Sequence, residues 1–489
     1  MRNPSTLNLL TLASALLLSA CALLPDSPPP DPDLPRTLRG GTALLPSGRD
    51  FGEFAWWKRF ADPVLDGLID RALAANNQIR TAFATVQQAE AQLRAARLAW
   101  LPTLATTGGG VAARGFGTTI TPRGAAGPGG VAAISDPLSD LGTLTAGYGG
   151  LVPSYSLNIF ANLNQTRLAE AALEVRRAAH DAVRLAVIGQ VAGGYFNLLA
   201  ARQQLTLQSQ LIEHLESLHA LETTRFRSGS NSALPQEQLA TRLGDTRASL
   251  PGIRDSIART ENALRLLAGQ NPGPVETPMG IEARPLDFQT DGSVPPSLPS
   301  AVLLHRPDIQ MAAHNLKLAE AQVGLANSAF FPEISLTGLA GGVSAALSNL
   351  LSANTGLWAA TAAASLPLLN ARKLAEVGAA SSGYQSAWYD YLQTVKAALA
   401  EVDDRLTSLQ QSAARLAYQQ AALTTARRAY RIVQARHQAG AVDRRTPLQA
   451  QLDLDNAEIA LNAAKLQHLT DLVALYQSLA GGYAVKPRP

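Results

Sequence analysis

The chain has 489 residues, and its 41 Lys and Arg against 38 Asp and Glu leave a formal net charge of +3. This near balance, without a long basic run, argues against nucleic-acid binding. Charged residues make up only 16% of the chain and a single cysteine excludes an intrachain disulfide, so the composition favours long helices over a disordered or disulfide-stapled fold.

The N-terminus has the pattern of a secretory signal, with Arg2, an apolar run up to Leu18 and small residues before Cys21. The ending LSAC resembles a bacterial lipobox. We therefore expect a signal peptide at 1–20 and a lipidated Cys21, whose palmitate-type chains anchor the protein stably in lipid. Ala22 favours sorting to the outer membrane, because many lipoproteins kept at the inner membrane have Asp there. The alternative is an ordinary signal peptide with an incidental cysteine.

Residues 21–53 contain the Pro-rich stretch 25–35 and are expected to form an extended tether. No later segment provides about 20 apolar residues free of charge and proline, so the sequence predicts no transmembrane helix after the signal. If the mature chain crosses a membrane, it must do so as a closed β-barrel, because its backbone groups have no other partners in lipid.

One motif occurs twice, as AEAQLRAARLAWLP at 89–102 and as AEAQVGLANSAFFP at 319–332. Each copy predicts a helix that ends before a proline, Pro102 or Pro332, where strand-like sequence begins. Each half then continues with a very long helix, a turn with Gly and another long helix. We therefore expect two structural repeats and a short tail, at 54–280, 281–480 and 481–489.

The first helix of each repeat is expected at about 63–100 and 307–330. The next helices begin near Leu163 and Ala371, and a length of about 60 residues would make each roughly 90 Å long. A seven-residue beat predicts coiled-coil seams, in which the polar positions indicate either a loose coil or a face toward water. The seams are Leu399, Val402, Leu406, Leu409, Ala413, Leu416, Gln420, Leu423, Arg427 and Tyr430, and then Leu448, Leu452, Asp455, Ile459, Asn462, Leu466, Leu469, Val473 and Tyr476.

Four strands are expected, at about 103–115, 145–160, 333–346 and 354–369. In EISLTG, Ile334 and Leu336 alternate with Glu333 and Ser335, and the stretch from Leu151 to Ile159 alternates in the same way. Apolar residues outward and polar residues inward are typical of a lipid-facing barrel. Because the smallest known membrane barrels use eight strands, the chain must oligomerise if these four strands lie in a membrane, and three copies would supply twelve.

The hairpin tips are expected at about 226–236 and 437–448. Gly229 and Gly440 suit left-handed C-caps of the long helices. Pro235 and Pro447 fall in the first turns of the returning helices, where proline is tolerated.

No catalytic or cofactor motif stands out. The seven histidines lack zinc-ligand spacing, and no P-loop, dinucleotide fingerprint or Gly-x-Ser-x-Gly occurs, so we expect no cofactor, no metal and no enzyme activity. Asp403 and Asp404 are interpreted as a solvated or salt-bridged pair. Trp56 and Trp57 are expected to pack the N-terminal segment onto an oligomer.

Four stretches together resemble the TolC-like outer-membrane factors, in particular the NodT/OprM-type lipoproteins of tripartite efflux pumps. They are FAWWKRFADPVLDGLIDRAL (54–73), LLHRPDI (303–309), the second AEAQ stretch with EISLTG, and RHQAGAVDRRTPLQAQ (436–451), whose partner in the first repeat is RFRSGSNSALPQEQLA (225–240). His305 stands where the family usually has Arg.

The resemblance implies a mainly helical fold with a β-barrel part. It implies a homotrimer with a twelve-stranded barrel in outer-membrane lipid and a helical tunnel in the periplasm. It also implies passive export of substrates delivered by an inner-membrane pump and a periplasmic adaptor, which would dock at the tips near Arg225 and Arg436.

The family often closes its tunnel at the second tip with aspartates six and nine residues after the turn Gly. Thr446 and Gln449 occupy these positions here, while Leu448 between them is kept. We therefore expect closure through Asp443, paired with Arg444 or Arg445, and through packing of Leu448. The alternative is that these charges are solvated and contact the adaptor.

Two other functions compete with the channel. A periplasmic adaptor lipoprotein would need one hairpin with β-rich domains outside it, whereas this sequence predicts two hairpins and two strand pairs. A lipid-anchored enzyme would need a site constellation, and the sequence offers none.

Overall fold

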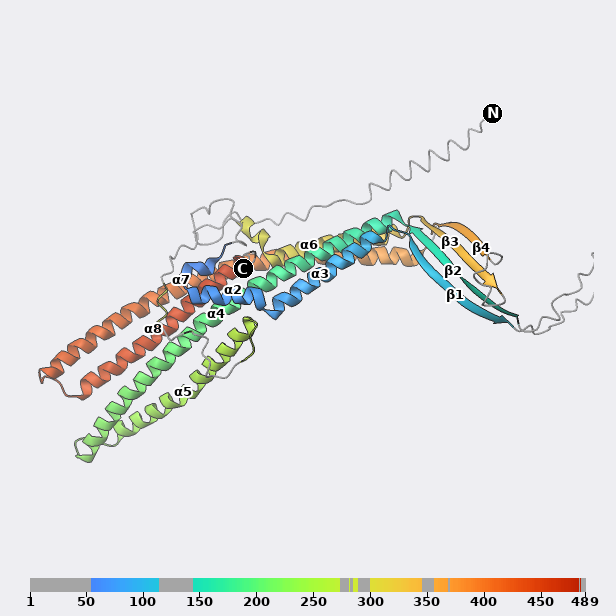
Figure 1. Cartoon of the computed structure of the whole chain (residues 1–489). Coiled ribbons are helices and arrows are strands. Elements are labelled where there is room, and N and C mark those ends of the chain that lie inside the picture. Colours follow the sequence, from blue (N-terminus) through green and yellow to red (C-terminus); the bar gives the residue numbers. More distant parts are fainter. Residues whose placement is uncertain are drawn as a thin grey trace, which may run out of the picture. The chain divides into compact units, whose positions relative to one another are not determined.

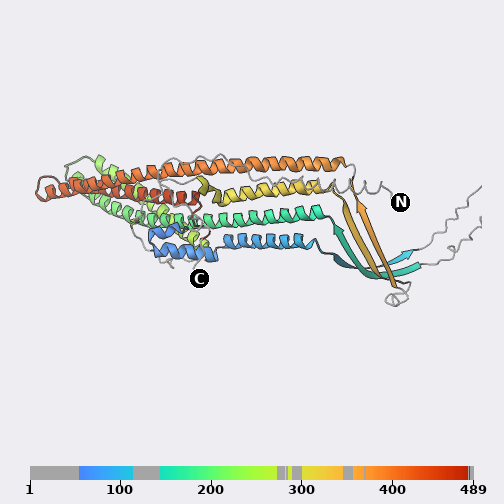
Figure 2. The same ribbon diagram turned by 90° about the horizontal axis from the view of Figure 1, so that it is seen from above.

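The computed structural model describes residues 54–113, 144–272, 281, 285–288, 300–344, 356–367, 370–482 and 484. The expected signal peptide, Cys21 and the tether lie outside these ranges. The elements, shown in Figures 1 and 2, are η3 (Trp56–Phe60), α2 (Pro63–Ala75), α3 (Asn77–Leu98), β1 (Thr103–Ala113), β2 (Leu144–Leu157), α4 (Ile159–Arg227), α5 (Leu234–Leu267), η4 (Ser300–His305), α6 (Pro307–Ser328), β3 (Glu333–Ser344), β4 (Gly356–Ser365), α7 (Ala371–Gln438) and α8 (Arg445–Ser478).

The two sequence repeats contain the same series of elements with nearly equal lengths. α3 and α6 have 22 residues each, and α5 and α8 have 34 each. α4 and α7 have 69 and 68 residues, which is longer than expected. The chain divides differently into two compact units, each of which takes residues from both repeats: 1–90, 171–317 and 385–489 form one, and 91–170 and 318–384 form the other.

The single helix expected at 63–100 is wrong, because α2 and α3 are separated at Asn76. The backbone of Asn76 is extended, with φ −63° and ψ 127°. Its side-chain oxygen accepts hydrogen bonds from the backbone N–H groups of Gln78 (2.8 Å) and Ile79 (3.2 Å) at the start of α3. An Asn that caps a new helix in this way ends the previous one, even inside a periodic apolar stretch.

The four strands form one antiparallel sheet in the order β1-β2-β3-β4. β1 and β3 begin at the expected residues, Thr103 and Glu333. The expectation that the strand alternation continues to Ile159 is wrong, because β2 ends at Leu157 and α4 begins at Ile159. The side chain of Asn158 accepts a hydrogen bond from the backbone N–H of Ala161 (2.9 Å) and so caps the start of α4.

The strand register confirms the expected alternation between an apolar and a polar face of the sheet. The register pairs Tyr155 with Leu336 and Leu336 with Ala362 on one face, and it joins Thr103, Ser154, Thr337 and Thr361 in a row on the other. By the same register, five exposed large apolar side chains lie together on the first face. These are Leu104, Leu151, Ile334, Leu336 and Trp358.

Pro102 and Pro332 each occupy the position immediately before a strand. α3 and α6 end with tight turns, in which the N–H of Leu101 donates to the carbonyl of Leu98 (2.9 Å) and that of Phe331 to Ser328 (3.1 Å). Proline has no N–H to extend the helical bonding, so the chain changes from helix to strand at this point in both repeats.

The main hydrophobic core packs α2, α4 and α8 around two tryptophans. Trp56 and Trp57 are fully buried. Trp56 stacks on Tyr476 with ring centroids 5.2 Å apart, and its Nε1–H donates to the carbonyl of Gly481 (3.2 Å). The expectation that these tryptophans pack on an oligomer is therefore wrong, because they fill the core of their own chain.

α4 is more apolar than we expected of any segment after the signal. One 18-residue window has a mean hydropathy of 1.3, which by length and composition would suffice to cross a membrane. Half of that window is buried in the structure. Val191, Tyr195 and Phe196 of α4 belong to the main core, so the apolarity of this helix serves packing within the chain.

Some of the expected seam positions of α7 are replaced by the residue before them, while the others keep their places. Val402 and Leu423 are buried as expected, but Ser412 is buried while Ala413 is exposed. An α-helix drifts about 20° per heptad from a strict seven-residue repeat, which moves the buried positions. Ala413 is therefore exposed, which is wrong for a seam position. Gln420 and Arg427 are also exposed, which agrees with the interpretation that the polar seam positions of this helix face water.

The polar seam positions of α8 are buried because α4 provides hydrogen-bond partners for them. Asp455 lies 2.6 Å from the Nδ1 of His214, and the Nδ2 of Asn462 donates to the carbonyl of Ala200 (3.0 Å). The two interpretations offered for these residues, a loose coil and a water-facing surface, are therefore both wrong.

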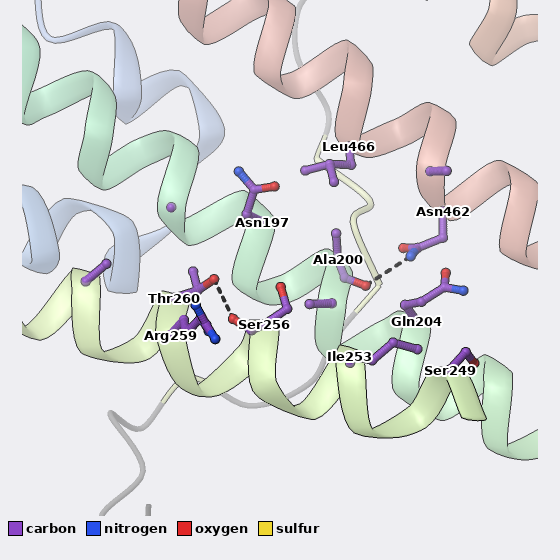
Figure 3. A pocket seen from close by; sticks show the side chains of 15 residues that line it. Asn197, Ala200, Gln204, Ser249, Ile253, Ser256, Arg259, Thr260, Asn462 and Leu466 are labelled. Atoms are coloured by element: carbon purple, nitrogen blue, oxygen red, sulfur yellow. Dashed lines mark hydrogen bonds between the residues drawn. The ribbon is translucent and has the colours of Figure 1, made fainter. Parts of the chain in front are cut away.

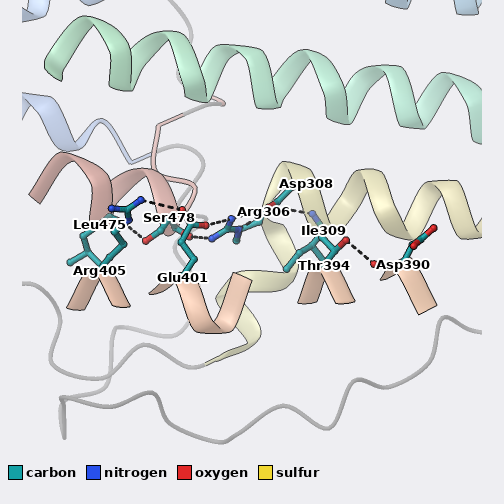
Figure 4. A network of polar contacts seen from close by, with 9 residues as sticks. All are labelled: Arg306, Asp308, Ile309, Asp390, Thr394, Glu401, Arg405, Leu475 and Ser478. Carbon is teal, nitrogen blue, oxygen red and sulfur yellow. Dashed lines mark hydrogen bonds and ion pairs between the residues drawn. The ribbon is translucent and has the colours of Figure 1, made fainter. Parts of the chain in front are cut away.

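Arg306, from the LLHRPDI segment, joins the start of α6 to α7 and to the end of α8 (Figure 4). Its guanidinium is buried and bidentate to Asp308, at 3.0 and 2.8 Å. It also donates to Glu401 (2.8 Å) and to the carbonyl of Ser478 (2.6 Å). Burial by itself would lower the pKa of Arg306, but its bonds and charge contacts with Asp308 and Glu401 raise it.

Replacing Trp56 tests the contribution of this core. We expect Trp56→Ala to destabilise the chain by about 3–5 kcal/mol, because it removes a fully buried ring and leaves a cavity. Unfolding of the detergent-solubilised protein, followed by near-UV circular dichroism, measures the loss. Tyr418→Ala is the control, since that ring is 76% exposed, and equal losses in both variants would contradict the account.

Candidate functional site

The candidate site lies at the turns of the two hairpins, α4–α5 and α7–α8, which lie at the same end of their unit (Figure 1). Gly229 and Gly440 follow the long helices with φ of 74° and 72°. The next N–H in each turn, of Ser230 or Ala441, donates to a carbonyl five residues back at 2.8 Å. Both helices thus end in the left-handed cap that the sequence predicts, and glycine suits the positive φ.

Asp443, in the second turn, connects the two hairpins. Its Oδ1 accepts hydrogen bonds from the backbone N–H (3.2 Å) and hydroxyl (2.8 Å) of Thr446, at the start of α8. Its Oδ2 accepts from the Nη1 of Arg225 (3.0 Å), at the end of α4. Within one chain, Asp443 thus contacts Arg225, and the expected pairing with Arg444 or Arg445 in a threefold ring of tips stays a prediction.

A second ion pair connects the same hairpins, but here the second hairpin provides the arginine and the first provides the carboxylate. Arg445, at the start of α8, places Nε 3.0 Å from the Oε1 of Glu222 on α4, without the alignment of a hydrogen bond. Asn231 donates to the Oε2 of Glu222 (2.7 Å) from the first turn. Glu222 is only 1% exposed, so its charge depends on these two partners.

The charged state of Asp443 is favoured by its contacts. The hydroxyl of Thr446 is the main cause that lowers the pKa of this carboxyl below its ordinary 3.8, and Arg225 adds to the effect. The carboxylate is therefore ionised near neutral pH and available to Arg225.

Leu448 packs between the hairpins rather than standing apart from them. It lies against a buried cluster formed by Leu211, Leu215, Leu218, Leu243 and Leu452. This cluster combines α4, α5 and α8, so apolar packing accompanies the two ion pairs.

The other residues singled out by sequence lie at the same tips but make fewer contacts. Arg444, Gln449 and Arg436 are exposed, while Pro235 and Pro447 lie in the first turns of α5 and α8. Sequence reasoning missed Glu222 and Asn231, whose residue types are ordinary for a helix surface and a turn. The one available signal was the spacing of Glu222 and Arg225, three residues apart on one helix.

A separate cleft of about 730 Å³ lies in the same unit, between α4, α5 and α8 (Figure 3). Small and uncharged polar residues such as Ala200, Gln204, Ser256 and Asn462 line most of it. Among the residues that the structure describes, no group of three His, Cys, Asp or Glu side chains could hold a metal ion.

Comparison with known proteins gives consistent matches over most of the chain. A family model described as "Outer membrane efflux protein" matches residues 68–270 and 298–481. The probable efflux pump outer membrane protein TtgC of Pseudomonas putida is 30% identical over 491 residues, which cover 98% of this chain and 96% of that protein. The probable outer membrane lipoprotein SilC of Salmonella typhimurium is 27% identical over 485 residues, 98% of this chain and 99% of that protein.

A solved structure with the same fold is the open state of the MtrE outer membrane channel of Neisseria gonorrhoeae. It superposes with a TM-score of 0.79 at 26% identity, over 96% of this chain and 100% of that one.

The two ion pairs should differ in strength. Arg445→Met leaves the buried Glu222 carboxylate without its ion-pair partner. We therefore expect the free energy of local opening at the tip of α4 to fall by on the order of 2–3 kcal/mol, which is less than the roughly 3–5 kcal/mol for breaking a fully buried pair. Arg225→Met removes an exposed pair and should cost about 0.2–1 kcal/mol. Native-state hydrogen exchange of amides 219–231 measures both opening free energies.

The second substitution Glu222→Gln is the matched control. Added to Arg445→Met, it removes the unpaired charge and should recover most of the loss. No recovery in the double variant would show that the Glu222 charge is not what Arg445 stabilises.

Proposed function

Because the chain belongs to the outer membrane efflux protein family, we propose that three copies of it form one passive export conduit. The protein is an outer-membrane channel component of an efflux system. The family is one of transport channels rather than enzymes, and we infer that the chain conducts without catalysis. The competing assignment as a periplasmic adaptor is set aside by the family match.

The observation that carries the proposal is the sheet with two different faces and two open edges. Within the residues that the structure describes, β1 and β4 each pair with another strand on one side only. In lipid, unpaired backbone groups cost several kcal/mol each, so the open edges must meet those of other copies. Three copies bring twelve strands, which place the apolar face toward lipid and the polar face toward a water-filled lumen.

The partners follow from this arrangement. We infer that an inner-membrane pump delivers the cargo and that a periplasmic adaptor joins the pump to the hairpin tips, near Arg225 and Arg436. The lipid on Cys21 would hold the N-terminal end at the outer membrane, as the description of SilC as a lipoprotein supports.

The tips supply the gate of the proposed conduit. In the structure, Arg225–Asp443 and Arg445–Glu222 hold the second hairpin against the first hairpin of the same copy. Opening a ring of such tips would require the second hairpin to move, and these ion pairs with the packing of Leu448 oppose that movement. Thr446 acts here by fixing Asp443, while Gln449 stays exposed near the tip.

Planar-bilayer conductance tests the gate. We expect Asp443→Ala and Arg445→Ala to raise the closed-state conductance of the trimer, because each removes one of the two connections between hairpins. Arg431→Ala is the control, since Arg431 is exposed and has no ion pair within the part of the chain described. Unchanged leak in both gate variants would refute the gate, and a wild-type protein that never conducts would refute the channel.

The closed-state conductance of the trimer should also depend on pH. A lowered pKa means that the Asp443 contacts stabilise the closed tip above pH 3.8 and are lost as the pH falls through the folded-state pKa. Wild-type conductance should therefore rise at the acid end, and Asp443→Ala should lack that step.

A further inference from the structure

The polar face of the sheet is a belt of hydroxyl groups near the helical end of the strands. Thr103, Ser154, Thr337 and Thr361 form one row across all four strands. The hydroxyls of Thr103 and Ser154 lie 2.7 Å apart, and that of Thr361 donates to the carbonyl of Thr337 (3.3 Å). Ser335 continues the belt in the neighbouring row.

One charged side chain, that of Glu333, lies among these hydroxyl groups. The four described strands contain no Asp, Lys, Arg or His, and Glu333 is their only Glu. It is the first residue of β3, directly after Pro332, and the register places it on the polar face with Ser335 and Thr337. Its side chain is exposed.

The contacts of Glu333 with other described residues do not compensate its charge. The hydroxyl of Ser156, on the neighbouring strand β2, donates to its Oε1 (2.9 Å) and orients the carboxylate along the polar face. A hydroxyl carries no formal charge, and no cation lies within ion-pair distance among the residues that the structure describes.

We propose that Glu333 sets the charge preference of the barrel. This rests on the proposed trimeric channel, in which three Glu333 carboxylates form one ring in the lumen at the junction of barrel and helices. Rings of Asp or Glu favour cations in water-filled pores. The remaining lining contributed by the described strands is neutral, so the ring dominates the field there, and cationic compounds pass it more readily than anionic ones.

The ring should act over a distance set by salt. Three carboxylates around one axis reinforce one another, and the Debye length is about 10 Å at 0.1 M ionic strength and about 30 Å at 0.01 M. Low ionic strength therefore shows the preference most clearly, and high salt should abolish it.

A reporter cysteine at Ser335, on the same face as Glu333, measures the local potential. The only native cysteine is Cys21, so wild-type trimers treated with the same reagents give the background. In trimers reconstituted into lipid vesicles, the rates of reaction of Ser335→Cys with a cationic and an anionic methanethiosulfonate reagent are compared at low and high salt. The same ratio is measured after adding Glu333→Gln.

We expect the cationic-to-anionic rate ratio to fall by about threefold or more at low salt when Glu333→Gln is added, and the difference to vanish at high salt. Ile334→Cys, one residue away on the apolar face, should react slowly with both reagents because it faces lipid.

Two results would overturn different parts of the account. Equal ratios with and without Glu333→Gln, while Ser335→Cys reacts faster than Ile334→Cys, would refute the role of Glu333 alone. Equal reactivity of Ser335→Cys and Ile334→Cys would refute the two-faced barrel, and with it the proposed channel and this inference.

Discussion

The open edges of the four-stranded sheet are the constraint on which the rest of the structure depends. β1 and β4 each leave a row of N–H and C=O groups without partners in the described part of the chain, and the apolar face beside them exposes residues such as Trp358 and Leu104. Neither feature is stable in water or, as an open sheet, in lipid. Closing the sheet with two further copies satisfies both requirements together, and it also creates the lumen that export needs.

Polar contacts between helices fix the position of the hairpins once the sheet is closed. Arg306 joins α6, α7 and α8, while Asp455 and Asn462 bond α8 to α4. At the tips, Glu222 and Asp443 each form an ion pair with an arginine of the other hairpin. Removing one partner of such a contact is costly when the other is buried, as Glu222 is, and cheap when it is exposed. The distribution of burial therefore decides which contacts can break during gating.

Sequence patterns predicted the elements well because their causes are local. The period of two in EISLTG, the prolines at 102 and 332 and the glycines at 229 and 440 each act within a few residues. The patterns failed where a partner from a distant segment decides the outcome. Asp443 pairs with Arg225, 218 residues away, and the buried polar residues of α8 depend on α4. The shifted seam of α7 and the break at Asn76 show that an idealised period also misses helix drift and side-chain capping.

Native mass spectrometry of the detergent-extracted mature protein tests the central claim most directly, because edge closure requires a fixed number of chains. The account predicts a particle of three chains that persists on dilution. A stable single chain that can be removed from the membrane only with detergent would contradict it. One four-stranded sheet cannot satisfy the backbone groups of its edges in lipid.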